Sequence, residues 1–69
     1  MKTLSGLEVC KILEKNGFEN VRQKGSHCIM QKKSENTTIS IPVPIHKELR
    51  IGTLMSIIRQ SGLGKKVFE

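Results

Sequence analysis

Residues 20–32 read NVRQKGSHCIMQK, and this stretch decides the fold. Gly25-Ser26 suits a two-residue hairpin turn of type II′, in which glycine takes the positive φ of the first position. The residues after the turn alternate between two faces, with Cys28 and Met30 on one and His27, Ile29 and Gln31 on the other. The stretch therefore predicts a β-hairpin with strands at residues 20–24 and 27–32.

A helix is expected before the hairpin, over residues 6–16. Ser5 and Glu8 have the spacing of a capping box, in which each side chain accepts a bond from the other residue's backbone N–H. Gly17 is expected to end the helix, because glycine accepts the positive φ that a helix C-terminus often needs.

A third strand is expected after the hairpin, over residues 37–43, with Ile39, Ile41 and Val43 on one face. Pro42 and Pro44 have no backbone N–H to donate, so this strand should lie at an edge of the sheet.

A second helix is expected to start near Gly52 or Thr53, with the Thr53 hydroxyl as its N-terminal cap. Gly62 should end this helix in the same way as Gly17 ends the first, and Phe68 of the short tail should dock on the core.

This order of elements predicts an α+β fold of the form α-β-β-β-α in a single domain, residues 1–69. A three-stranded antiparallel sheet with both helices on one face buries every apolar stripe and leaves the other face open. A chain of this length buries only about 60% of its unfolded surface, which leaves no room for a deep cofactor pocket. Any active site should therefore be an open surface.

The chain is basic, with 12 Lys and Arg against 6 acidic residues and a net charge of +6. Small basic chains bind nucleic acid, anionic membranes or acidic partners. No apolar run approaches the roughly 18 residues of a membrane span, and the N-terminus lacks a signal-peptide pattern. We expect a cytoplasmic protein without a membrane partner, in which Cys10 and Cys28 stay reduced.

His27 is the first candidate for chemistry, since it begins a strand on the open face of the predicted sheet. Imidazole titrates near neutral pH, so it can both accept and donate a proton. The alternative is an exposed strand residue without a role, and position alone favours that alternative because isolated histidines are common.

Basic side chains bracket His27 and are candidates for phosphate binding. They are Arg22, Lys24, Lys32 and Lys33, and Ser26 in the turn can help to orient the site. The alternative is a solvated edge that discourages strand pairing, which lysine often provides. Phe18 and Phe68 are the only aromatic residues and both fit the core, so RNA would be held through its phosphates with little sequence preference.

His46 is a second candidate, either for proton transfer or for contact with a phosphate. The interpretation that the sequence favours is a loop histidine hydrogen-bonded to the backbone near a helix start. The cysteines and histidines lack zinc-site spacing, aspartate is absent and the glutamates are scattered. No metal and no small-molecule cofactor are expected, so any phosphodiester chemistry should be independent of metal.

A group of motifs resembles the HicA toxin family over nearly the whole chain. The motifs are Ser5-Gly6, Asn16-Gly17-Phe18, Arg22, Gly25-Ser26-His27, residues 42–46, Gly52-Thr53-Leu54 and residues 57–60. The resemblance implies a fold like the double-stranded-RNA-binding domain and a toxin of a type II toxin–antitoxin system that cleaves mRNA. It maps the family's essential histidine onto His27 and implies a HicB antitoxin that covers this region. Met30 departs from the family, where Tyr or Phe is frequent.

With this resemblance, catalysis becomes the preferred role for His27, and the predicted function is a metal-independent endoribonuclease acting on mRNA. The main alternative is a non-catalytic module of the double-stranded-RNA-binding type. A third interpretation is a protein-interaction domain whose basic face docks an acidic partner.

Overall fold

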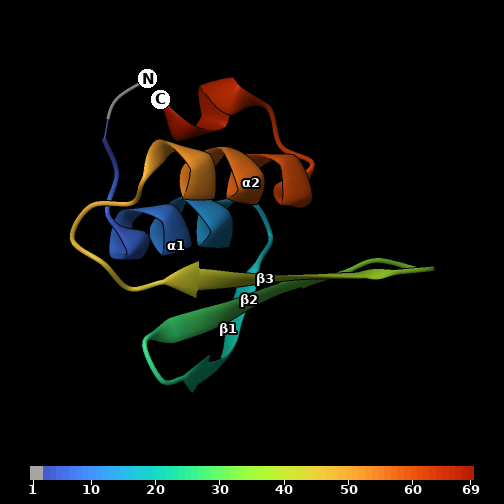
Figure 1. Ribbon diagram of the computed structural model, residues 1–69. Helices are drawn as coiled ribbons and strands as arrows, with labels where there is room; N and C mark the ends of the chain where they lie inside the picture. The colour runs from blue at the N-terminus through green and yellow to red at the C-terminus, as the bar shows by residue number, and fades with distance from the viewer. Residues whose placement is uncertain (1–2) are drawn as a thin grey trace.

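The computed structural model describes residues 3–69 and shows a three-stranded sheet covered on one face by two helices (Figure 1). Its elements are α1 (Gly6–Lys15), β1 (Glu19–Lys24), β2 (His27–Lys33), β3 (Thr38–Pro44), α2 (Ile51–Ser61) and a short 3₁₀ helix, η1 (Lys65–Phe68). The strands are antiparallel in the order β1-β2-β3. This confirms the predicted α+β fold, and β3 with its two prolines lies at an edge as expected.

The central hairpin forms as the sequence predicts. Lys24 pairs with His27 across the turn, and Gly25 has a φ of 61°. Ser26 does not take a positive φ, so the turn is of type II′. Because the turn sets the register, it also decides which β2 side chains face the helices.

Helix α1 is capped at both ends as predicted. The Ser5 hydroxyl accepts a bond from the Glu8 N–H at 3.1 Å, and the Glu8 carboxylate accepts one from the Ser5 N–H at 2.9 Å. At the other end Gly17 has a φ of 95°, and the Phe18 N–H donates to the Leu13 carbonyl at 3.0 Å. The chain is thereby turned from the helix into β1.

The predicted cap of the second helix is wrong. Helix α2 begins at Ile51 with Arg50 as its N-cap, and no side chain caps it. The extended backbone of Arg50 presents its carbonyl to the Leu54 N–H at 2.9 Å, which starts the helix earlier than expected. Thr53 therefore lies inside the first turn, while the end at Gly62, with a φ of 72°, is as predicted.

One apolar core lies between the sheet and the helices. Its members include Val9 and Leu13 from α1, Cys28 and Met30 from β2, Ile41 and Val43 from β3, and Leu54, Ile57 and Ile58 from α2. Phe68 of η1 is fully buried, which confirms that the tail docks on the core. The alternation of buried and exposed residues along β2 leaves its other face free of core contacts.

Residues 45–49, which we call the connector, link β3 to α2 and are held on two sides. The Ile45 N–H donates to the Ser26 carbonyl at 2.7 Å, and the Gly6 N–H donates to the His46 carbonyl at 2.9 Å. A Cβ atom on Gly6 would overlap the Pro44 carbonyl oxygen and lie 2.9 Å from the Ile45 Cα. The start of α1 thus packs backbone to backbone against the end of β3, which only glycine permits.

Gly6→Ala should lower the free energy of unfolding by about 1–3 kcal/mol, the usual cost of overpacking a rigid site. The matched control is Gly52→Ala in the first turn of α2, where an added Cβ would meet nothing within 4 Å. The control should be stabilising by about 0.5–1 kcal/mol, because alanine favours a helix over glycine. Urea unfolding of both variants measures the difference, and equal effects would contradict the close contact at Gly6.

The two buried cysteines lie in this core as free thiols. Burial raises the pKa of the Cys10 thiol to about 11, and the neighbouring Cys28 adds to the effect. The Asn20 side-chain amide donates to the Cys28 sulfur at 3.7 Å. Cys10 therefore stays a neutral thiol at physiological pH and is a poor nucleophile.

The raised pKa of Cys10 predicts a loss of stability at alkaline pH. The thiol of Cys10 ionises near pH 9 in the unfolded chain and near pH 11 in the folded one. Its contribution to the free energy of unfolding is therefore fully present below pH 9 and is lost as pH rises from 9 through 11. The full loss should be about 2–3 kcal/mol. Urea unfolding across this range, under reducing conditions, should give a shallower pH dependence for Cys10→Ala than for the wild type. Parallel curves would contradict the prediction.

Candidate functional site

The open face of the sheet carries the predicted catalytic histidine. Paired residues of an antiparallel ladder share a face, so the residues paired with His27 and Ile29 lie on the same side as they do. Continued along β2, the face comprises Glu19, Arg22 and Lys24 of β1, His27, Ile29, Gln31 and Lys33 of β2, and Thr38, Ser40, Pro42 and Pro44 of β3. Cys28 and Met30 face the helices, as predicted.

His27 is exposed at the first position of the central strand, between Lys24 on one side and Pro44 on the other. Within residues 3–69 its ring takes part in no hydrogen bond. The imidazole is therefore accessible to a ligand that approaches the open face.

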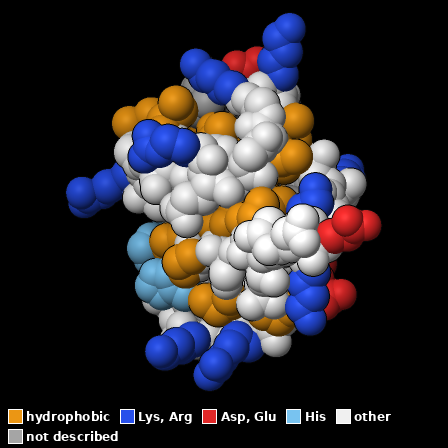
Figure 2. Space-filling model, turned by 90° about the vertical axis from the view of Figure 1, so that its right-hand side faces the viewer, with side chains coloured by type: hydrophobic (Ala, Val, Ile, Leu, Met, Phe, Trp, Pro, Cys, Tyr) orange, Lys and Arg blue, Asp and Glu red, His pale blue; other side chains and the backbone are white. Residues whose placement is uncertain are grey.

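Arg22 and Lys24 lie beside His27, because Lys24 is its cross-strand partner and Arg22 pairs with Ile29. Lys33 shares the face but stands six positions along β2, about 20 Å away at roughly 3.3 Å per residue. In Figure 2 the visible histidine atoms form a single patch at one edge, and the acidic side chains lie away from it. The cations near His27 are thus Arg22 and Lys24, with Lys33 at the far end of the face.

Lys32 lies on the opposite face from His27. It pairs with the inward-facing Ile39, and its ammonium is 5.7 Å from the centroid of the Phe18 ring. This is the geometry of a cation–π contact at the edge of the core. The structure therefore does not bring Lys32 together with the other basic residues singled out from the sequence.

Ser26 connects the hairpin turn to the connector. Its carbonyl accepts the 2.7 Å bond from Ile45, while its hydroxyl makes no hydrogen bond within residues 3–69. The hydroxyl is exposed next to His27 and can meet a ligand there.

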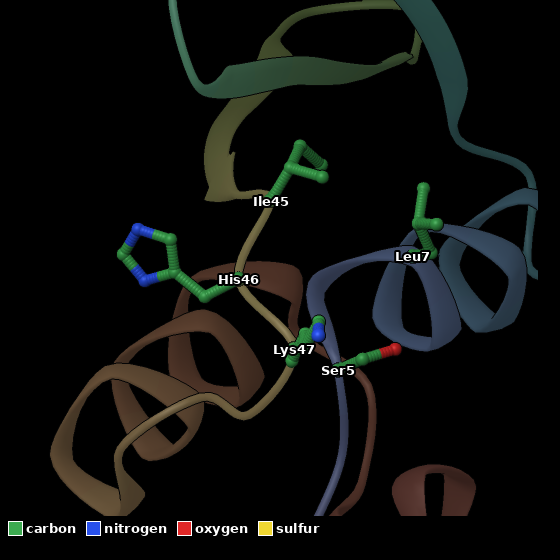
Figure 3. A pocket seen from close by; sticks show the side chains of 5 residues that line it. All are labelled: Ser5, Leu7, Ile45, His46 and Lys47. Atoms are coloured by element: carbon green, nitrogen blue, oxygen red, sulfur yellow. The ribbon is translucent and has the colours of Figure 1, made fainter.

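A groove of about 300 Å³ lies between the start of α1 and the connector (Figure 3). It is lined by Ser5, Leu7, Ile45, His46 and Lys47. Leu7 is 60% exposed and forms one wall, whereas the His46 ring points away from Leu7. Sequence reasoning did not single out Leu7, although it lies outside the apolar stripe of the predicted helix and so could have been recognised as an exposed apolar residue.

The part of the chain that the structure describes, residues 3–69, holds no group of three or more histidine, cysteine or carboxylate side chains arranged to bind a metal ion. Within the same residues, neither helix has the length and apolar character needed to cross a bilayer.

Comparison with known proteins identifies the family. The family model of the HicA toxin of bacterial toxin–antitoxin systems matches residues 6–63 of the 69-residue chain. The chain belongs to the HicA toxin family. No curated protein and no solved structure matched. As a HicA-family toxin it has the role of the toxin component, which implies an antitoxin partner.

The matched region contains the hairpin and the connector but not Ser5, which lines the groove. It begins at Gly6, which packs against the connector, and includes the hairpin with His27 as well as the whole of α2. The resemblance noted from the sequence is therefore confirmed over these residues.

Proposed function

We propose that this HicA-family toxin is a metal-independent endoribonuclease that cleaves mRNA in the cytoplasm, and that a cognate HicB antitoxin inhibits it. The observation that carries the proposal is the position of His27. Its ring is exposed and free of hydrogen bonds within residues 3–69, and it stands beside Lys24 on an uncovered sheet face. The HicA family, whose members are in general ribonucleases, makes RNA the expected substrate.

In the proposed reaction, His27 transfers a proton while a ribose 2′-OH attacks the adjacent phosphate. General acid–base assistance of this kind contributes typically about 10²–10⁴-fold. Arg22 and Lys24 hold the phosphate and offset the charge that develops in the transition state. Ser26 orients the substrate through its free hydroxyl, and Lys33 holds the strand farther along the same face.

We propose that the RNA is bound mainly through its phosphates. Phe18 and Phe68 are both buried, so neither offers a platform on which a base could stack. The open face instead carries the cations described above and the small apolar surfaces of Ile29 and Pro42. We therefore expect weak sequence preference in the isolated toxin.

The antitoxin is proposed to act by covering the same face. An inhibitor that binds over His27 blocks access of RNA to the imidazole, and acidic groups on the inhibitor would complement Arg22 and Lys24.

A second candidate function is binding of duplex RNA without cleavage. The α-β-β-β-α arrangement supports it, because domains of the double-stranded-RNA-binding type recognise duplexes by shape. This candidate makes no use of a free imidazole at the end of β2, which is why we prefer the ribonuclease.

His27→Ala should reduce cleavage of a labelled single-stranded RNA by at least about 100-fold, since it removes the proton-transferring group. The residue is exposed and outside the core, so the urea midpoint and HicB binding should stay close to those of the wild type. Cleavage by the wild type should continue in excess EDTA.

Three results would count against this proposal. Full activity of His27→Ala would exclude the catalytic histidine, and loss of wild-type activity in EDTA would exclude the metal-independent reaction. Tight binding of duplex RNA, with neither duplex nor single strand cut by the wild type, would favour the second candidate.

Binding of single-stranded RNA to the inactive His27→Ala protein should weaken with salt. If about five phosphates are contacted, log K should fall against log salt with a slope of about −3.5. Lys24→Gln should make the slope shallower by about 0.7, the share of one phosphate. Lys65→Gln is the control, because Lys65 lies in η1, on the far side of the helices from the sheet (Figure 1).

The assignment of Lys32 to RNA binding is tested in the same assay. Its side chain lies over Phe18 on the other face, so Lys32→Gln changes the slope only if the side chain reaches around the strand to the RNA.

A slope that Lys24→Gln leaves unchanged would argue against the proposed phosphate contact beside His27.

A further inference from the structure

We propose that His46 supplies a second imidazole, which forms an acid–base pair with His27 at the end of β2 and β3. The inference rests on the proposed ribonuclease function and adds to it a second catalytic residue and the chemical nature of the products.

The strand pairing places the two histidines beside each other. His27 pairs with Pro44, and the bond from the Ile45 N–H to the Ser26 carbonyl continues the ladder one step beyond the strand. Val43 is buried and Ile45 packs against the core, so Pro44 and His46 face the other way, as His27 does. Extending the alternation by two residues beyond Pro44 makes His46 the diagonal neighbour of His27, and for such neighbours the Cβ atoms lie about 7 Å apart.

The backbone of His46 is held while its ring is free. The His46 carbonyl accepts the 2.9 Å bond from the Gly6 N–H, and the tight contact of Gly6 with Pro44 prevents the connector from shifting toward α1. Within residues 3–69 the ring makes no hydrogen bond, and it points away from Leu7 in Figure 3. His46 is thus a loop residue bonded to the backbone at the start of α1, as the sequence indicated, but the bond is made by its carbonyl and leaves the ring free.

A Cβ separation of about 7 Å leaves room for a phosphodiester between the two side chains. In displacement at phosphorus the attacking and leaving oxygens lie roughly in line on opposite sides of the phosphorus atom. A base and an acid must each reach one of these oxygens to about 3 Å. Two imidazoles at neighbouring positions of one face can reach the two oxygens at the same time. A single imidazole at one side of the phosphorus can reach only one of them.

The reaction balances without any co-reactant. One neutral imidazole accepts the proton of the 2′-OH as the 2′-oxygen forms its bond to phosphorus. The bond from phosphorus to the 5′-oxygen breaks, and that oxygen takes a proton from the other imidazole, which starts protonated. The products are a 2′,3′-cyclic phosphate and a 5′-hydroxyl, and the two imidazoles have exchanged protonation states.

The neighbouring elements surround the pair mostly with positive charge. The charged residues on the elements that flank the pair are Arg22 and Lys24 on β1, Lys47 and Glu48 on the connector, Arg50 before α2 and Glu8 in the first turn of α1. Glu8 is engaged with the Ser5 N–H in the capping box. The cations favour binding of a phosphate between the two rings.

The test compares His46→Gln with the wild type in single-turnover cleavage of a single-stranded RNA in EDTA. Glutamine keeps hydrogen-bonding ability but cannot titrate. We expect a rate loss of about 10²–10⁴-fold, RNA affinity within about twofold of wild type, and loss of one limb of a bell-shaped pH–rate profile. Glu48→Gln, which removes a charge from the same connector but leaves both imidazoles in place, should retain both limbs. The cleaved RNA should carry a 2′,3′-cyclic phosphate.

A substrate with sulfur in place of the bridging 5′-oxygen assigns the roles. Because a thiolate leaves without needing a proton, this substrate should restore the rate of only one of the two variants His27→Gln and His46→Gln. The restored variant identifies the acid. Rescue of one variant and not the other is the signature of the pair.

Several outcomes would overturn the inference while leaving the proposed function intact. If His27→Ala is inactive but His46→Gln cleaves at the wild-type rate with both limbs, His46 has no catalytic role. If His46→Gln mainly weakens RNA binding and the sulfur substrate rescues neither variant, His46 is only a phosphate contact. His46→Asn, together with urea midpoints, separates these outcomes from a folding defect. Failure of the wild type to cleave RNA would refute both proposals.

Discussion

The contact on which the site depends is the backbone packing of Gly6 against Pro44 and the hydrogen bond from Gly6 to the His46 carbonyl. It joins the first turn of α1 to the end of β3, two parts of the chain that are far apart in sequence. A side chain at Gly6 would separate them, because it would occupy the space of a carbonyl oxygen. The same contact therefore closes the core and holds the connector beside the hairpin turn.

The small size of the chain leaves one face of the sheet buried and the other exposed. With so few residues, one face of the sheet builds the core; both helices cover this face, and η1 adds Phe68 to the core from the far side of the helices. The other face is left with polar and charged side chains, the small apolar surfaces of Ile29 and the prolines, and the exposed imidazole of His27. The core and the proposed site thus use alternate residues of the same strands, so we expect substitutions on the open face to leave the protein folded.

Much of this architecture could be read from local patterns. The capping box at Ser5, the glycines that end both helices and the type II′ turn at Gly25 act over a few residues each, and all were predicted correctly. The strand alternation also predicts that Lys32 shares a face with Cys28 and Met30. Lys32 was nevertheless assigned to the basic site because of its charge. The cap at Thr53 was mispredicted because an extended Arg50 offers its carbonyl without any side-chain signal.

The sequence by itself determined the order of elements, the face that is buried and the exposure of His27, because turns, caps and alternation depend on neighbours along the chain. Only the tertiary structure decided that His27 pairs with Pro44, two residues before His46, and that Gly6 must lack a side chain. It also decided that Lys32 rests on Phe18. These contacts come from packing between segments that are remote in sequence. Local sequence patterns do not specify how far apart such segments lie in the folded protein.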